Sequence, residues 1–166
     1  MTMSDKFLQT RDTEEFSDPL QDYDPKTYSD PLAKALADQT VAAIQTTPVA
    51  TVTPDTPVHA AVEKLAGLQV SCLLVVKDGK LVGVFSDRDV LERVALEYDR
   101  VKDRPVGELM TTDPVYAYEA DSAAAALSIM AVSGFRHVPV TDIEQRVVGI
   151  VSPQRVAEFL RRQVLN

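Results

Sequence analysis

The chain has 166 residues, of which 25 are acidic and 17 are Lys or Arg, so its formal net charge is −8 and its isoelectric point is about 4.7. This balance argues against bulk electrostatic binding to nucleic acid or to an anionic membrane. The sequence has no bilayer-length apolar run, no secretory signal pattern and a single cysteine, which excludes an internal disulfide. We therefore expect a cytoplasmic protein that does not enter the membrane.

The first 30 residues differ in composition from the rest of the chain. They contain eight acidic and three basic residues, and their apolar residues follow no period. Such a segment cannot bury enough apolar surface to fold alone, so we expect residues 1–30 to form an acidic, weakly structured arm that lies along the body or on a second subunit. A lead-in helix is expected over 31–44, with Asp30 as its N-cap and Pro31 in its first position.

The elements that follow form one unit that occurs twice. The first unit is expected to have strands at 49–52, 72–76 and 81–85, a helix at 56–67 and a closing helix from 86 to about 98. The second unit repeats this order, with strands at 115–118, 137–140 and 147–151 and helices at 121–133 and 152–164.

The duplication is visible at a constant offset of 66 residues. Pro48 falls on Pro114, Gly83 on Gly149 and Ser86 on Ser152, and no gap is needed. We assign residues 45–108 to the first repeat with its linker and residues 109–166 to the second. A strand–helix–strand crossover favours parallel pairing and leaves one sheet face bare. The predicted fold class is therefore α+β, with two tandem β-α-β-β-α repeats packed with pseudo-twofold symmetry.

Two stretches, LVGVFSDRDV (81–90) and VVGIVSPQRV (147–156), share a frame of glycine, two apolar residues and serine. Together with MTTDP (110–114) and RHVPVTD (136–142), they resemble a pair of CBS domains, the Bateman module, from about residue 44 to the C-terminus. The resemblance implies a regulatory, non-catalytic sensor. Its ligand would be an adenosine-containing molecule, such as AMP, ADP or ATP, bound in clefts between the repeats without a covalent cofactor.

The same resemblance implies homodimers in which the modules form a flat disc. Many family members carry an effector domain, whereas here we expect a stand-alone type that acts on an unknown effector protein. The acidic arm is then the expected output element, docked on the disc or exchanged with a partner.

Ser86 and Asp89 are the first candidate site residues. Ser86 lies where a strand turns into a helix, so it caps free amides, and an acid three residues later is typical of a capping box. The same geometry makes an anion site, in which Ser86 would hold phosphate. In similar proteins, the residue matching Asp89 accepts the hydroxyls of a ribose.

The second copy keeps the serine but reverses the charge. Ser152 followed by Pro153 is a favourable helix start, whereas Arg155 in the first turn opposes the helix dipole. We therefore expect a negative group beside Arg155, namely Asp87 or Asp89 across the pseudo-twofold, a neighbouring subunit, or a ligand phosphate. A guanidinium cannot accept hydrogen bonds from ribose, so we infer one complete nucleoside site per module.

Arg136 and His137 precede a strand of the second repeat. They are either a solvated strand end or a phosphate clamp, in which arginine binds through its planar fork and histidine adds a pH-sensitive donor. The first repeat has Val70 and Ser71 at these positions. Thr47, at the entry to the first repeat, is expected to contribute to an adenine site.

A second hypothesis competes with the sensor. The chain could be a structural dimerisation and interaction module with vestigial nucleotide clefts, which Arg155 and the absence of a basic pair in the first repeat favour. The sequence contains no metal-ligand pattern, Walker-type loop or nucleophile motif, so we do not expect an enzyme.

Overall fold

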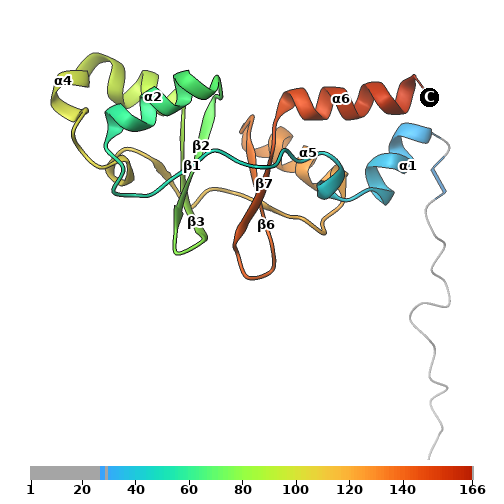
Figure 1. Ribbon diagram of the computed structural model, residues 1–166. Coiled ribbons are helices and arrows are strands. Elements are labelled where there is room, and N and C mark those ends of the chain that lie inside the picture. Colours follow the sequence, from blue (N-terminus) through green and yellow to red (C-terminus); the bar gives the residue numbers. More distant parts are fainter. Residues whose placement is uncertain (1–26, 29, 166) are drawn as a thin grey trace, which may run out of the picture.

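The computed structural model of the chain describes residues 27–28 and 30–165 (Figure 1), so nearly all of the predicted arm lies outside the described residues. Helix α1 (Pro31–Asp38) begins as expected, because Asp30 Oδ1 accepts a hydrogen bond from Leu32 N at 3.0 Å. It ends at Asp38, and a 3-10 turn (Val41–Ala43) follows. The lead-in helix is therefore shorter than predicted.

The first repeat forms a four-stranded sheet in the order β1-β2-β3-β4. β1 (Thr51–Val52) pairs in parallel with β2 (Cys72–Lys77) through the crossover helix α2 (Val58–Leu68), as predicted. β2 and β3 (Lys80–Ser86) form an antiparallel hairpin. The sequence did not predict β4 (Thr111–Thr112), which pairs antiparallel with β3.

The second repeat has the same order of elements in a three-stranded sheet, β5-β6-β7. Its elements are β5 (Ala117–Tyr118), α5 (Ala123–Ser133), β6 (Val138–Thr141), β7 (Val147–Val151) and α6 (Pro153–Val164). β5 and β6 are parallel, and β6 and β7 are antiparallel. Helices α2, α4 and α6 lie along the upper side of the molecule and the hairpin tips project below it in the view of Figure 1.

Each repeat receives a segment from the chain that leads into the other repeat. Residues 44–50, the first strap, cross the sheet of the second repeat, where Thr46 and Ile150 exchange backbone hydrogen bonds of 2.8 and 3.3 Å. Residues 109–113, the second strap, contain β4 and cross the sheet of the first repeat. This exchange joins the two repeats through backbone pairing as well as through side chains.

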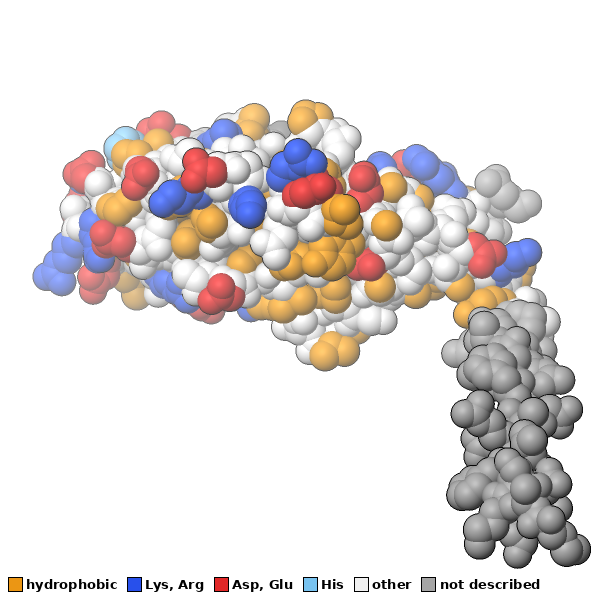
Figure 2. Space-filling model, turned by 90° about the horizontal axis from the view of Figure 1, so that it is seen from below, with side chains coloured by type: hydrophobic (Ala, Val, Ile, Leu, Met, Phe, Trp, Pro, Cys, Tyr) orange, Lys and Arg blue, Asp and Glu red, His pale blue; other side chains and the backbone are white. Residues whose placement is uncertain are grey.

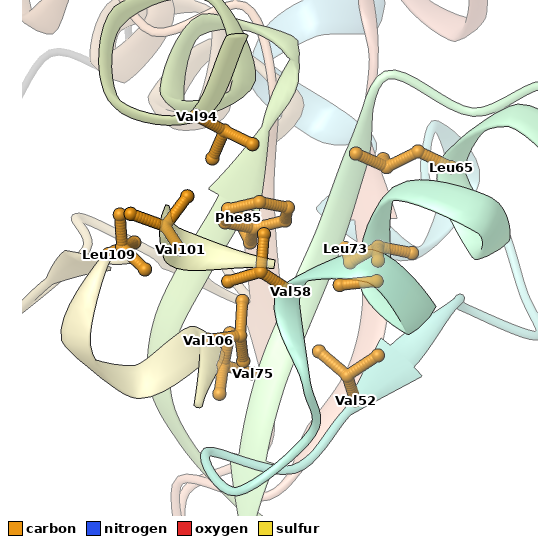
Figure 3. Packing of buried hydrophobic residues seen from close by; sticks show 11 residues of the cluster. Val52, Val58, Leu65, Leu73, Val75, Phe85, Val94, Val101, Val106 and Leu109 are labelled. Carbon is orange, nitrogen blue, oxygen red and sulfur yellow. The ribbon is translucent and has the colours of Figure 1, made fainter. Parts of the chain in front are cut away.

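Because of the straps, the two cores are discontinuous in sequence. In the first core, Phe85 and Val75 pack with Val106 and Leu109 from the linker (Figure 3). In the second core, Val41 and other residues before the first strap pack with strands and helices of the second repeat. Helix α1 accordingly packs against α5 and α6 (Figure 1).

The prediction of a duplication without gaps is wrong by one residue. Val75 pairs with Gly83 in the first hairpin, whereas Val140 pairs with Gly149 in the second. The second hairpin is therefore one residue longer, and the repeats are related by 65 residues from α2 to β6. The identical glycines and serines after the hairpins conceal this change, because they follow the insertion.

The helix expected from residue 86 to about 98 is irregular. It consists of α3 (Asp87–Asp89), a π-helical stretch (Val90–Val94), a 3-10 turn (Ala95–Glu97) and α4 (Tyr98–Val101). Within it, Val94 points into the core and is 1% exposed, whereas Leu91 and Leu96 are 71% and 97% exposed. The first repeat thus presents apolar side chains to solvent along this segment.

Candidate ligand-binding site

A cavity of about 550 Å³ lies between the two repeats. The first strap forms one wall, and the start of the closing helix and the residues before β2 form the adjoining walls of the first repeat. The second repeat contributes the residues before β6 and the start of α6. Both repeats therefore line one shared cavity.

The structure brings four of the seven predicted site residues into this cavity and leaves three outside its lining. Those that line it are Ser86, Arg136, His137 and Ser152, and those that do not are Thr47, Asp89 and Arg155. Thr47 is exposed, although its neighbours Thr46 and Pro48 line the cavity. Further lining residues that we did not predict include Asp87, Arg88 and Thr111.

The polar part of the cavity favours an anion. The closing segments of both repeats begin at the cavity, at Ser86 and Ser152, and the positive end of the dipole of the twelve-residue helix α6 favours negative charge there. Arg88 and Arg136 add two guanidinium groups, and Asp87 is the acidic residue of the lining. In a chain of net charge −8, this cavity gathers local groups that can hold an anion.

His137 and Cys72 are structural counterparts in the lining: Cys72 pairs with the capping serine Ser86, and His137 directly precedes Val138, which pairs with the residue before Ser152. Burial and the neighbouring Arg136 lower the pKa of His137, although Asp87 acts in the opposite direction. Burial raises the pKa of the Cys72 thiol to about 12, and the negative charges of Asp89 and Asp87 act in the same direction. Cys72 is therefore a neutral, buried thiol.

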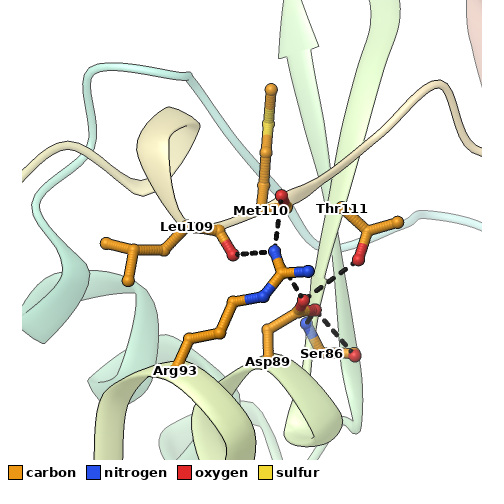
Figure 4. Close-up of polar contacts among 6 residues, drawn as sticks. All are labelled: Ser86, Asp89, Arg93, Leu109, Met110 and Thr111. Atoms are coloured by element: carbon orange, nitrogen blue, oxygen red, sulfur yellow. Dashed lines mark hydrogen bonds and ion pairs between the residues drawn. The ribbon is translucent and has the colours of Figure 1, made fainter.

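Asp89 lies behind the cavity wall in a dense polar network (Figure 4). Its Oδ2 accepts hydrogen bonds from Ser86 N and Ser86 Oγ at 2.9 Å each, and its Oδ1 accepts one from Thr111 Oγ1 at 3.0 Å. Arg93 Nη1 lies 3.5 Å from Oδ1 and also donates to the carbonyls of Leu109 and Met110. The buried carboxylate thus joins the helix start to the second strap.

Arg155 occupies the corresponding position in the second repeat and makes different contacts. Its Nη1 donates to Glu158 Oε2 at 2.8 Å, and its Nη2 donates to the backbone carbonyl of Gln45 at 3.3 Å. The expected balance by Asp87 or Asp89 is therefore wrong, whereas a contact with a neighbouring subunit or a ligand phosphate stays a prediction. The negative partner is Glu158 in the same helix, which also pairs with Arg162.

The shared glycine of the two frames has a common physical reason, which is the close approach of a strap. A Cβ on Gly83 would lie 3.0 Å from Thr111 O and would overlap Met110 Sδ. A Cβ on Gly149 would lie 2.7 Å from Gln45 Cδ. At Gly83 the close atoms include the strap backbone, whereas at Gly149 they all belong to the side chain of Gln45, so each glycine leaves room for a part of the strap that crosses its sheet.

Asp87 and Arg88 directly follow the predicted Ser86, but the sequence analysis missed them as lining residues. The capping-box pattern points only to the serine and to the acid three residues later. Thr111 was missed for a different reason. The hydroxyl reaches the cavity only because the second strap pairs with β3, and this pairing is tertiary. The presence of Thr111 within the MTTDP stretch was a usable signal.

The surface view from below shows side chains of both charges interspersed, with apolar side chains gathered around the middle of that face (Figure 2). Among residues 27–28 and 30–165, no helix is long and apolar enough to cross a membrane. Within the same described part, no group of three or more His, Cys, Asp or Glu side chains could hold a metal ion.

Comparison with known proteins identifies the repeated unit. A family model described as "CBS domain" matches residues 41–96 and again residues 106–162. The chain is 34% identical over 107 residues to the CBS domain-containing protein YhcV of Bacillus subtilis, covering 64% of this chain and 75% of YhcV. It is 35% identical over 105 residues to CBSCBSPB1 of Arabidopsis thaliana, covering 63% of this chain but only 19% of that longer protein.

Solved structures agree with this assignment. The crystal structure of the CBS-pair protein CBSX2 from Arabidopsis thaliana has a TM-score of 0.69 and 28% identity, covering 77% of this chain and 98% of that one. A structure of CBSX2 in complex with AMP has a TM-score of 0.67 and 28% identity, covering 77% and 99%. The exchanged straps, the doubled glycine frame and these matches lead to one conclusion: the chain belongs to the CBS-domain family and contains a pair of CBS domains.

Proposed function

We propose that the cavity between the repeats binds an adenine nucleotide and that the protein is a regulatory sensor. The observation that carries this proposal is the convergence of two helix starts, Arg88, Arg136 and His137 on one cavity that both repeats line. A ligand that touches both repeats favours the arrangement in which they close around it, and it can shift that equilibrium only by its differential affinity. The AMP complex of CBSX2 supports the choice of ligand.

The cavity offers separate surfaces for the two ends of a nucleotide. Apolar side chains of Val49, Val84, Ile150 and Phe135 suit the flat face of a purine, whereas the basic residues and helix starts suit its phosphate. Arginine can bind a phosphate through two parallel hydrogen bonds. In this proposal Arg136 is the main phosphate ligand, and His137 and Ser152 are additional donors.

The predicted contact of Asp89 with a ribose stays a prediction. In the structure its two oxygens already accept three hydrogen bonds, and the side chain is 4% exposed. A ribose hydroxyl would have to replace the hydroxyl of Ser86 or Thr111. We therefore assign Asp89 a positioning role, in which it holds these two hydroxyls at the cavity wall.

Calorimetric titration with AMP, ADP, ATP, adenosine and inorganic phosphate tests the proposal. We expect saturable binding of at least one nucleotide. The variant Arg136→Gln should weaken nucleotide binding roughly tenfold or more and leave adenosine binding nearly unchanged, because it removes a charged hydrogen-bond donor to phosphate. Arg161→Gln is the matched control, since Arg161 is exposed on α6 and does not line the cavity. Absence of binding at millimolar ligand would reject the sensor function.

The second candidate function, dimerisation and partner binding, has one specific observation in its favour. Leu91, Leu96 and Tyr98 expose apolar surface along the irregular closing segment of the first repeat. Apolar side chains gathered on a surface are typical of protein contacts. Sedimentation equilibrium of the wild type and of the double variant Leu91→Ser/Leu96→Ser would test this. A stable wild-type dimer that dissociates in the variant would support it, and a monomeric wild type would reject self-association.

A further inference from the structure

We infer that Arg155 is a positioning residue for the cavity, because it fixes the strap that forms one cavity wall. The inference concerns the same site as the proposed function and rests on it for the ligand. It gives the reversed charge of the second repeat a structural purpose that requires no contact between Arg155 and a ligand.

The first step is the contact between Arg155 and the strap. Arg155 Nη2 donates a hydrogen bond of 3.3 Å to the carbonyl of Gln45, a residue 110 positions away in the sequence. The next strap residue, Thr46, pairs with Ile150 through two backbone hydrogen bonds and lines the cavity. The guanidinium therefore acts on the backbone one residue from the cavity wall.

The second step is the rigidity of this anchor. The side chain of Gln45 lies over Gly149, and its Nε2 donates to Glu119 Oε1 at 2.6 Å. Glu158 holds the guanidinium from the other side through Nη1 at 2.8 Å. Arg155 Nε is buried without a hydrogen-bond partner among the described residues, so the side chain is held by its two terminal nitrogens.

The third step is that only the first strap forms an extended wall. Its residues Thr46, Pro48, Val49 and Ala50 all line the cavity, whereas the second strap contributes Thr111 alone. A displacement of the first strap would change the shape of the cavity along four residues. The second repeat, which has Arg155 where the first repeat has Asp89, thus anchors the strap that forms the longer part of the cavity wall.

Two measurements on Arg155→Met test this inference. The first is hydrogen exchange at the amides of Thr46 and Ile150, which we expect to become at least about tenfold faster because the strap loses a charged anchor. The second is binding of AMP and of adenosine, which should weaken by a similar factor, roughly tenfold, because the wall serves the whole ligand. Arg155→Lys, which keeps a donor for the carbonyl, should restore part of both effects.

Arg162→Met is the matched control, because Arg162 binds the same Glu158 from the same helix and does not contact the strap. Unchanged exchange in Arg155→Met, or equal effects in Arg162→Met, would overturn the inference. Loss of AMP binding with unchanged adenosine binding would also overturn it, since Arg155 would then act on the phosphate. If Arg155→Met does not fold, the same comparison is made with Arg155→Lys. Its amide exchange at Thr46 and Ile150 should be faster than in the wild type but slower than expected for a strap without an anchor. If the wild type binds no nucleotide, the proposed function fails while the exchange experiment still decides whether Arg155 anchors the strap.

Discussion

The two repeats solve the same structural problem with opposite polarity. In the first repeat, a buried acceptor, Asp89, receives a hydrogen bond from the hydroxyl of Thr111 on the second strap. In the second repeat, a donor, Arg155, gives a hydrogen bond to the carbonyl of Gln45 on the first strap. Each helix start is thus tied to the strap that crosses its sheet: the first repeat uses the acceptor Asp89 together with the donor Arg93, which binds two strap carbonyls, whereas the second repeat uses the donor Arg155.

The reversed charge at Arg155 is compensated within its own helix. Asp89 at a helix start is favoured by the dipole, whereas Arg155 at the same position is not. Glu158 one turn later offsets that cost, and Arg162 and Arg155 together lower the pKa of Glu158 through hydrogen bonds and charge attraction, against partial desolvation. Where the first repeat has the single carboxylate of Asp89, the second repeat therefore has two linked ion pairs within α6, in which Glu158 binds both Arg155 and Arg162.

The largest expected effect is the loss of the acceptor in the first repeat. Asp89→Asn should lower the free energy of unfolding by about 3 kcal/mol, because an amide group cannot accept from Ser86 N, Ser86 Oγ and Thr111 Oγ1 together. Urea denaturation measures it. Arg155→Met should cost less, about 1 kcal/mol, because Arg155 is partly exposed. Equal losses would contradict the different roles of the two residues.

The crossing of the straps predicts the next effect. Gly83→Ala should destabilise by about 2 kcal/mol, because the added methyl group meets the strap backbone at Thr111 O, and Gly149→Ala should cost less, because it meets only the flexible side chain of Gln45. Gly67→Ala is the control, since Gly67 lies in α2 and an added methyl group there would meet nothing within 4 Å. It should be neutral or stabilising by up to about 1 kcal/mol. Tolerance of alanine at both frame glycines would show that the straps are loosely held.

A smaller effect distinguishes a strap that is held through a side chain from one that is held through its backbone. Thr111→Val removes the hydroxyl that binds Asp89 with little change of shape, so it should cost about 1 kcal/mol of unfolding free energy. In the second repeat the acceptor is the backbone carbonyl of Gln45, so no side-chain substitution there removes it. If Thr111→Val costs as much in the Asp89→Asn background as in the wild type, the hydroxyl does not act through Asp89.

The smallest effect is a pH dependence at His137. Because its folded-state pKa is lowered, the unfolded chain takes up the proton first, and stability falls as pH drops below the ordinary histidine value of about 6.5. His137→Gln removes this contribution. The wild type should therefore lose stability relative to the variant between about pH 7.5 and 5.5, as followed by thermal unfolding. Parallel pH curves of the wild type and His137→Gln would mean that the pKa of His137 is not lowered in the folded chain.

The repeats, the order of their elements and the parallel pairing could be predicted because they follow from local hydrophobic patterns and turn residues. The straps could not, since the pairing of Thr46 with Ile150 depends on the packing of the two repeats. The pair of Arg155 with Glu158 was missed for a different reason, because it is local in sequence. Glu158 lies three residues away in the sequence, so a pair within one helix turn was available without any charge from across the pseudo-twofold.

The hairpin insertion shows why duplicated motifs can mislead. The glycine and serine of each frame follow the inserted residue, so they align at 66, whereas the residues before it align at 65. His137 therefore has Cys72 as its structural counterpart. The same shift makes the basic residue Arg136 correspond to Ser71, so the segment before the hairpin supplies a basic side chain to the cavity in the second repeat and not in the first.

The central claim is that the cavity shared by the two repeats is the nucleotide site. Its most direct test is a titration of the ¹⁵N-labelled full chain with AMP, followed by amide chemical shifts. We expect saturable changes at Ser86, Arg136, His137 and Ser152, which belong to different repeats and line one cavity. Saturable changes confined to the exposed segment around Leu91 and Leu96, or none at millimolar AMP, would contradict it.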